Sequence, residues 1–122
     1  MTEQFLLCLG ENGITSLIKC QDHNPEMQAK LYDTLVRIVG GDMDELITPD
    51  TLKLKGLEDG FQVVLLASKN YNDRKRNPFF HDVLGNVVIC LQNTDWDGFH
   101  DYSGLTMKEI SSLPAKFTFP NF

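Results

Sequence analysis

The residues between positions 69 and 81 combine cations, side-chain amides and aromatic rings in one short stretch. Arginine guanidinium groups match phosphate oxygens with two parallel hydrogen bonds, and aromatic rings stack on nucleobases at about 1–3 kcal/mol each. A loop of this composition is therefore a candidate site for a small nucleotide-like anion. The candidate ligand-binding residues are Lys69, Tyr71, Arg74, Lys75, Arg76, Asn77, Phe80, His81 and, from a second loop, Trp96.

Within this set the chemistry divides between charge and stacking. The three consecutive cations at positions 74–76 would meet the phosphates, and the ring of Tyr71, Phe80 or Trp96 would stack on a base. The alternative is a solvated charged loop in which Phe79 and Phe80 only fill the core. Both interpretations remain open from the sequence.

The charge of the chain is distributed unevenly. Its 122 residues include 17 acidic and 11 basic side chains, a net charge of -6. Residues 69–76 hold four cations and Asp73, a net +3, which leaves -9 for the remainder; two of the three arginines lie in this segment. General affinity for nucleic acid needs basic surface that displaces counterions, so this acidic chain is not expected to have it.

Length and composition indicate a single globular domain over residues 1–122. Domains typically have about 100–150 residues, and 42% hydrophobic with 23% charged residues excludes a disordered chain. No apolar run approaches the ~20 residues of a membrane-spanning helix, and the first residues lack the pattern of a signal peptide. We expect a cytoplasmic protein that does not associate with membranes.

A second polar loop, at residues 93–101, has part of the pattern of a calcium-binding loop. Oxygen-bearing side chains occupy its positions 1, 3, 5 and 9, and a glycine occupies position 6. The twelfth position, however, is Gly104 instead of glutamate, and a strand is expected before the loop instead of a helix. We favour an acidic aromatic loop in which Trp96, Phe99 and Tyr102 serve burial, stacking or a protein interface. A weak metal site is the alternative.

No catalytic motif is present. The sequence lacks a nucleophile elbow, a P-loop, an H-E-x-x-H helix and a dinucleotide-binding glycine motif. The three histidines, His23, His81 and His100, lie in or beside loops, where a histidine that satisfies one hydrogen bond is common. We expect a protein that is not an enzyme; the catalytic alternative is a His81 base beside Asp82 or Asp101.

The cysteines predict neither a disulfide framework nor a zinc site. The chain has an odd number of cysteines, so one stays unpaired in any disulfide arrangement, and none has C-x-x-C spacing. They are Cys8, Cys20 and Cys90. Each lies in or beside an apolar stretch. We expect reduced, buried thiols, and no metal or other cofactor.

Short apolar runs between turn signals predict a sheet. Asn12-Gly13 favours a tight corner, so residues 5–9 and 14–19 are expected to form an N-terminal hairpin. Residues 43–47 predict a short strand, and 52–57 another extended piece. The β-branched content of residues 61–67 and 84–91 predicts two central strands. Long polar loops are expected at 68–82 and 92–104, and loops of this length are often functional.

Two helices complete the expected fold. Asn24 and Pro25 suit the start of a helix whose apolar face repeats through Leu31 and Leu35, and Gly40-Gly41 suits its end. Thr106 and Glu109 have capping-box spacing ahead of a short second helix. We therefore predict an α+β fold, with a mostly antiparallel sheet, one main helix packed on it and a short C-terminal helix.

Several segments together resemble a known family. They are LVRIVGG at 35–41, the acidic-hydrophobic strand at 42–47, VVLL at 63–66, Asn77, DVLGNVVI at 82–89, GLT at 104–106 and Glu109-Ile110. This set, which covers about two thirds of the chain, resembles a family of short proteins of phages, plasmids and conjugative elements catalogued as a domain of unknown function. Members of that family have a short turn around a Glu-Gly pair at the place where this chain has the basic segment 72–76. The resemblance implies a mobile-element origin and a host cytoplasm, and it implies no catalytic residues.

These observations favour a non-enzymatic binding protein. The leading expectation is sequestration of a small anionic, nucleotide-like ligand, as in counter-defence proteins that remove immune signals. The alternative is a protein-binding inhibitor, in which the acidic surface occupies a host nuclease or defence protein. We expect a homo-oligomer with the pocket between subunits, and the tail residues Phe117, Phe119 and Phe122 are the candidate dimer contact.

Overall fold

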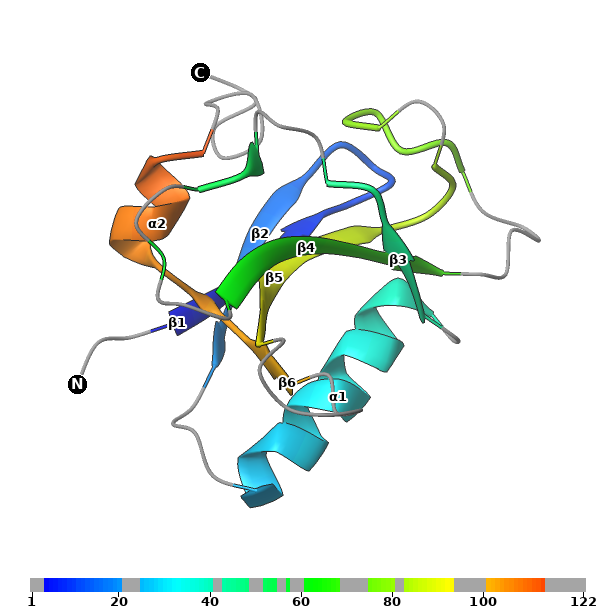
Figure 1. Ribbon diagram of the computed structural model, residues 1–122. Helices are drawn as coiled ribbons and strands as arrows, with labels where there is room; N and C mark the ends of the chain where they lie inside the picture. The colour runs from blue at the N-terminus through cyan, green and yellow to red at the C-terminus, as the bar shows by residue number, and fades with distance from the viewer. Residues whose placement is uncertain are drawn as a thin grey trace.

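The computed structural model describes residues 4–20, 25–40, 43–48, 52–54, 57, 61–68, 75–80, 83–93 and 101–113. In this part of the chain seven strands form one sheet in the order β2-β1-β5-β4-β3, with β6 beside β5 and β7 beside β1 (Figure 1). Every strand pair is antiparallel. The predicted α+β class with a mostly antiparallel sheet is therefore confirmed. The elements are β1 (Gln4–Leu9), β2 (Thr15–Cys20), α1 (Pro25–Val39), β3 (Met43–Leu46), β4 (Phe61–Ser68), β5 (Val87–Asn93), β6 (Asp101–Ser103), β7 (Leu105–Thr106) and α2 (Met107–Ser111).

The predicted N-terminal hairpin is confirmed. Its corner is a three-residue loop closed by hydrogen bonds from Gly10 N to Ile14 O and from Gly13 N to Gly10 O, both 2.9 Å. Gly13 has a φ of 86°, the left-handed conformation that such a loop requires at its last residue. The Asn12 Oδ1 atom accepts the Ile14 N–H at 3.0 Å, which fixes the turn.

The second central strand begins later than the sequence indicates. Residues 84–91 read as one apolar strand, but Gly85 has a φ of 88° and Leu84 instead makes an isolated bridge with Arg76. The strand β5 therefore starts at Val87 and runs on to Asn93. Both long loops are accordingly shorter than predicted, because Ser68 belongs to β4 and residues 92, 93 and 101–103 belong to strands.

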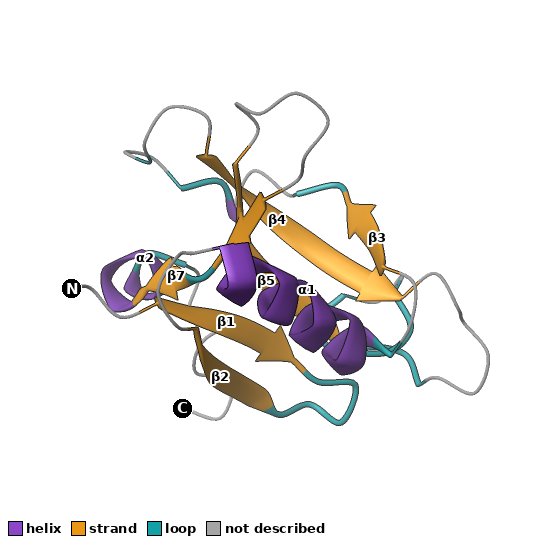
Figure 2. Ribbon diagram, turned by 90° about the horizontal axis from the view of Figure 1, so that it is seen from below, coloured by secondary structure: helices purple, strands orange, loops and turns teal. Residues whose placement is uncertain are grey.

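Side chains on the two faces of the sheet form separate buried clusters. On one face, Leu35 and Val39 of α1 belong to a cluster with Leu6, Val64 and Val88. On the other, Ile110 of α2 and Leu113 join a cluster that includes Leu7, Leu65 and Ile89. Because neighbouring residues of a strand point to opposite faces, the two helices lie on opposite sides of the sheet (Figures 1 and 2).

The helix ends have the local chemistry that the sequence predicts. At the end of α1, Gly40 has a φ of 88° and donates its N–H to Val36 O at 2.8 Å. At the start of α2, Glu109 N donates to Thr106 Oγ1 at 3.2 Å and Thr106 N donates to Glu109 Oε1 at 2.8 Å, a complete capping box. The predicted N-cap of α1, Asn24, lies outside the described residues. Neither described helix is long and apolar enough to cross a membrane.

Gly104 joins β6 to β7 and lies against the first residues of β1. Strand β6 pairs with β5, and β7 pairs with Gln4 and Phe5 of β1; both pairs are antiparallel. A Cβ atom on Gly104 would lie 2.8 Å from Phe5 N and 2.9 Å from both Phe5 O and Cys20 Sγ. Only glycine therefore fits where the two backbones meet.

We predict that Gly104→Ala destabilises the protein by about 1–3 kcal/mol, the usual cost of forcing a methyl group into a packed site. The free energy of unfolding in urea would measure this. Adding Cys20→Ala to the same chain should not restore stability, because two of the three close atoms belong to the Phe5 backbone. An unchanged midpoint for Gly104→Ala would contradict this account of the close contact with Phe5.

Candidate functional site

Four of the nine predicted ligand-binding residues lie in the described part of the chain: Lys75, Arg76, Asn77 and Phe80. The other five, Lys69, Tyr71, Arg74, His81 and Trp96, lie outside it. So do the centre of the predicted calcium-like loop (94–100), the catalytic alternative at His81, and the aromatic tail.

Residues 75–77 and 83–85 form a small two-stranded arm, which we call the basic arm. Asn77 N donates to Val83 O and Gly85 N donates to Lys75 O, both at 2.8 Å, on either side of the bridge between Arg76 and Leu84. The side chains of Lys75 and Arg76 are exposed. This part of the predicted loop is thus ordered backbone that presents two adjacent cations to solvent (Figure 1, light green).

The side chain of Asn77 anchors the arm to the sheet. It is fully buried, and its Nδ2 atom donates to Leu9 O and to Gly85 O, both at 2.9 Å. Its Oδ1 atom accepts the Phe79 N–H at 2.9 Å. The amide thus donates both of its protons to acceptors within the protein.

A second set of hydrogen bonds joins the arm to the hairpin corner and to α1. Lys75 N donates to Glu11 Oε2 at 3.0 Å, and Glu11 N donates to Asn86 Oδ1 at 3.0 Å. Asn86 Nδ2 in turn donates to Ile38 O, near the end of α1, at 2.9 Å. The backbone at Lys75 is therefore held directly by Glu11 and Gly85, and Glu11 is connected through Asn86 to α1.

The aromatic residues of the arm's turn contact the core. Phe79, Phe80 and Val83 are partly buried and pack against the cluster that contains Leu7 and Ile89. This is the core-filling role considered for Phe79 and Phe80 as the alternative to ligand binding. Since Phe80 is only partly buried, stacking of its ring on a base stays a prediction.

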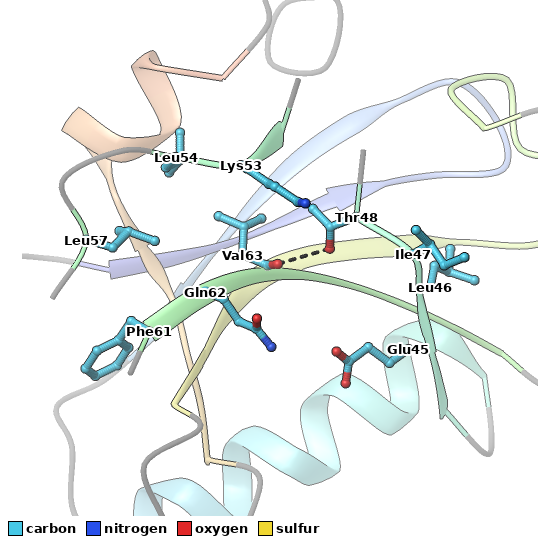
Figure 3. Close-up of a pocket in the computed structure, with 10 residues that line it drawn as sticks. All are labelled: Glu45, Leu46, Ile47, Thr48, Lys53, Leu54, Leu57, Phe61, Gln62 and Val63. Carbon is cyan, nitrogen blue, oxygen red and sulfur yellow. Dashed lines mark hydrogen bonds between the residues drawn. The ribbon is translucent and has the colours of Figure 1, made fainter. Parts of the chain in front are cut away.

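A pocket that the sequence analysis missed lies elsewhere, beside the edge formed by β3 and the start of β4 (Figure 3). Its volume is about 610 Å³, and none of its lining residues belongs to the basic arm. The lining residues are Glu45, Leu46, Ile47, Thr48, Lys53, Leu54, Leu57, Phe61, Gln62 and Val63. One signal for it was present in the sequence, since Thr48-Pro49 favours an end to the strand before it; β3 ends at Leu46 and pairs only with residues 65–68 of β4.

The pocket has an apolar wall and a polar wall. Leu46, Leu54, Leu57 and Phe61 are partly buried against the cluster that contains Leu65. The polar wall is Glu45 with Gln62, and the two are connected through buried Gln92. Gln62 Nε2 donates to Gln92 Oε1 at 3.0 Å, and Gln92 Nε2 donates to Glu45 Oε2 at 3.4 Å.

The cysteines offer no nucleophile. All three are free thiols; Cys8 and Cys90 are buried and Cys20 is partly buried. Burial raises the pKa of the Cys20 thiol to about 11 and also raises the pKa of Cys8 and, most strongly, of Cys90. A thiol with a raised pKa stays protonated at neutral pH and is a poor nucleophile or metal ligand. Among the described residues no three His, Cys, Asp or Glu side chains gather as metal ligands would.

We predict that Asn77→Ala lowers the free energy of unfolding by about 3 kcal/mol, because two carbonyls and one N–H lose a buried partner. Asn77→Asp should be worse at pH 7, since the new carboxylate would face the carbonyl oxygens of Leu9 and Gly85. That contact and burial raise the pKa of the carboxyl in the folded state. Its folded state then binds the proton more tightly than its unfolded state, so the deficit of Asn77→Asp should shrink as the pH falls from 7 towards 4.

Urea unfolding of both variants and of the parent protein at pH 7 and pH 4 measures this difference. Asn77→Ala is the control, because it adds no titratable group and its deficit should be the same at both pH values. Equal deficits for Asn77→Asp at the two pH values would contradict the assigned contacts.

Comparisons with known proteins add no relative: no family model, no curated protein and no solved structure matches the chain. The resemblance to the family of mobile-element proteins therefore stays a prediction.

Proposed function

We propose that this is a non-enzymatic binding protein that captures a small anionic ligand with the basic arm. The observation that carries the proposal is the pair of exposed cations, Lys75 and Arg76, on backbone held by Asn77 and Glu11. Cations on an ordered backbone lose less conformational freedom on binding than the same cations on a loose loop. The sheet, with α1 as the main helix packed on it, is the rigid base in this proposal.

The ligand class follows from the chemistry of the arm and its neighbours in the sequence. Guanidinium and ammonium groups both favour phosphate, because the first binds two oxygens and the second adds a point charge. Lys69 and Arg74 would complete the cationic set, and Tyr71, Phe80 or Trp96 would stack on a base. A nucleotide combines both parts. Asn77 and His81 complete the predicted set, and in this proposal Asn77 acts by positioning the arm.

The biological setting belongs to the same proposal. We take the protein to be of phage or mobile-element origin and to act in the host cytoplasm, where it would sequester a nucleotide immune signal. A single small domain offers limited concavity, so a homo-oligomer in which arms of two copies face one ligand is the favoured assembly.

A second candidate is inhibition of a host nuclease or defence protein through the acidic surface. The observation that favours it is the edge strand β3, which carries Asp44 and exposed Glu45; Glu45 lines the pocket. A basic protein surface would be attracted to these carboxylates, and charge complementarity of this kind speeds association.

The test of capture uses the protein incubated with cell lysate that contains nucleotide signals. After re-purification, heat release and mass spectrometry of the supernatant identify any bound ligand, and titration calorimetry gives its affinity. Arg74→Ala with Arg76→Ala should weaken binding about 100-fold, because each lost charge-assisted hydrogen bond contributes about 1.5–3 kcal/mol. Affinity should also fall as salt rises.

The matched control is Arg37→Ala with Lys108→Ala, which removes two exposed cations from α1 and α2 and changes the net charge equally. It should retain the parent affinity. Equal losses in both double variants would mean that only net charge matters and would contradict a site on the arm. A co-purifying host protein with no released small molecule would favour inhibition.

A further inference from the structure

The first residues of β4 extend beyond the strand that covers the rest of its edge. Strand β3 pairs only with residues 65–68, whereas β5 pairs with β4 from Phe61 onward. Among the described residues, no strand pairs with residues 61–64 on the β3 side. This stretch borders the pocket described above.

The backbone of this stretch is oriented for strand pairing. Thr48 Oγ1 donates to Val63 O at 3.1 Å, so the N–H and C=O of Val63 point to the β3 side of the sheet. Because backbone groups alternate along a strand, those of Phe61 point the same way. An added strand would therefore meet the backbone groups of Phe61 and the N–H of Val63, whose C=O already accepts the Thr48 hydroxyl.

The two walls of the pocket lie on opposite faces of β4. Glu45 is paired with Leu66, and Gln62 shares the face of Leu66, so both lie on the side of α1. Leu54 and Leu57 lie on the other face, with Lys53 (Figure 3). Successive side chains of a strand laid along this edge would thus meet apolar surface and carboxylate in alternation.

We propose that this edge binds a short extended peptide segment of a partner protein, which adds a strand to β4. Its apolar side chains would pack on Leu54, Leu57 and Phe61, and the lysine or arginine next in sequence would face Glu45. Charge complementarity selects the basic residue, because it would face the Glu45 carboxylate and the chain outside residues 69–76 has a net charge of -9. A pocket of about 610 Å³ accommodates a few residues.

This site does not depend on anion capture. It shares no residue with the basic arm and takes a ligand of opposite charge. It also supplies a partner class for the inhibitor candidate, namely a protein with an accessible segment of alternating apolar and basic residues.

The probe is a fluorescein-labelled hexapeptide of alternating leucine and lysine, titrated with the full chain and followed by fluorescence anisotropy. It should bind at least tenfold more tightly than two controls: the same residues in blocks of three, and a hexapeptide of alternating leucine and glutamate. The block peptide has the same charge, so equal binding of both lysine peptides would reduce the effect to net charge and overturn the proposal.

Backbone N-methylation of the probe tests strand addition directly. In a strand added antiparallel to β4, a residue whose side chain lies on the Phe61 face directs its N–H towards β4, and its neighbours direct theirs away. N-methylation of the leucines should therefore abolish binding, whereas N-methylation of the lysines should leave it within about twofold. Equal sensitivity at both kinds of residue would overturn the strand geometry.

Charge reversal at the polar wall tests the partner's charge. Glu45→Lys should weaken the leucine-lysine probe about tenfold and strengthen the leucine-glutamate peptide, since an attraction is replaced by repulsion. Asp33→Lys, an equal charge change at an exposed position of α1, should have little effect. The Arg74→Ala, Arg76→Ala variant should bind the probe normally, so failure of this proposal and failure of anion capture can be distinguished.

Other occupants of the edge would give different results. If a second copy of the chain fills it, the parent protein should elute as a dimer and Glu45→Lys should change its oligomeric state without any peptide. If a small molecule fills it, mass spectrometry should find a ligand whose release is altered by Glu45→Lys. Either outcome, without probe binding, would overturn the peptide proposal.

Discussion

The buried amide of Asn77 is the contact on which the arrangement of this end of the molecule depends. Its side chain donates hydrogen bonds to Leu9 O at the end of β1 and to Gly85 O before β5, and it accepts one from Phe79 N in the turn of the arm. The environment consists of two acceptors and one donor, and a carboxamide presents two donors and one acceptor in a single plane. Aspartate has the shape but lacks the donors, and leucine lacks both kinds of group. Each unmet partner here would be a buried polar group, and such groups are costly.

From this anchor, order extends into a segment whose composition suggests a loop. The arm pairs with residues 83–85, Glu11 accepts its backbone at Lys75, and Asn86 connects Glu11 to the end of α1. Glu11 uses one carboxylate oxygen for a backbone N–H and brings negative charge beside two cations. These contacts hold the arm through backbone atoms and do not use the charged ends of Lys75 and Arg76.

Much of the fold could be predicted because its signals are local. Asn12-Gly13, Gly40 and the pair Thr106 and Glu109 act on their own backbone, and each has the predicted role. The start of β5 could not be predicted the same way. The positive φ of Gly85 delays the strand to Val87, and the apolar pattern of residues 84–91 does not reveal that backbone conformation. Strands β6 and β7, at three and two residues, are too short for a periodic pattern.

The candidate sites show the same difference between features set by local sequence and features set by chain topology. The exposed cations of the arm follow from the local charge pattern, so composition was enough to find Lys75 and Arg76. Asn77, by contrast, was singled out by residue type, and its contacts with Leu9 and Gly85 come from chain topology. The pocket depends on where β3 stops relative to β4, which no local pattern specifies. Glu45 and Gln62 share a face only because of the pairing register between those strands.

The register also determines how strongly the two surfaces can influence each other. Phe61 pairs with Asn93 at the end of β5, whereas the arm precedes Val87 at its start, so the apolar part of the pocket lies about 20 Å from the arm along the strand. Glu45 is closer, two strand spacings or about 10 Å from Val88. The screening length at physiological salt is about 8 Å, so repulsion between a bound phosphate and Glu45 is largely screened there and grows at low salt. In these two proposals, an anion on the arm and a basic peptide at the edge would bind at the same time, because the charges of the two sites are largely screened from each other.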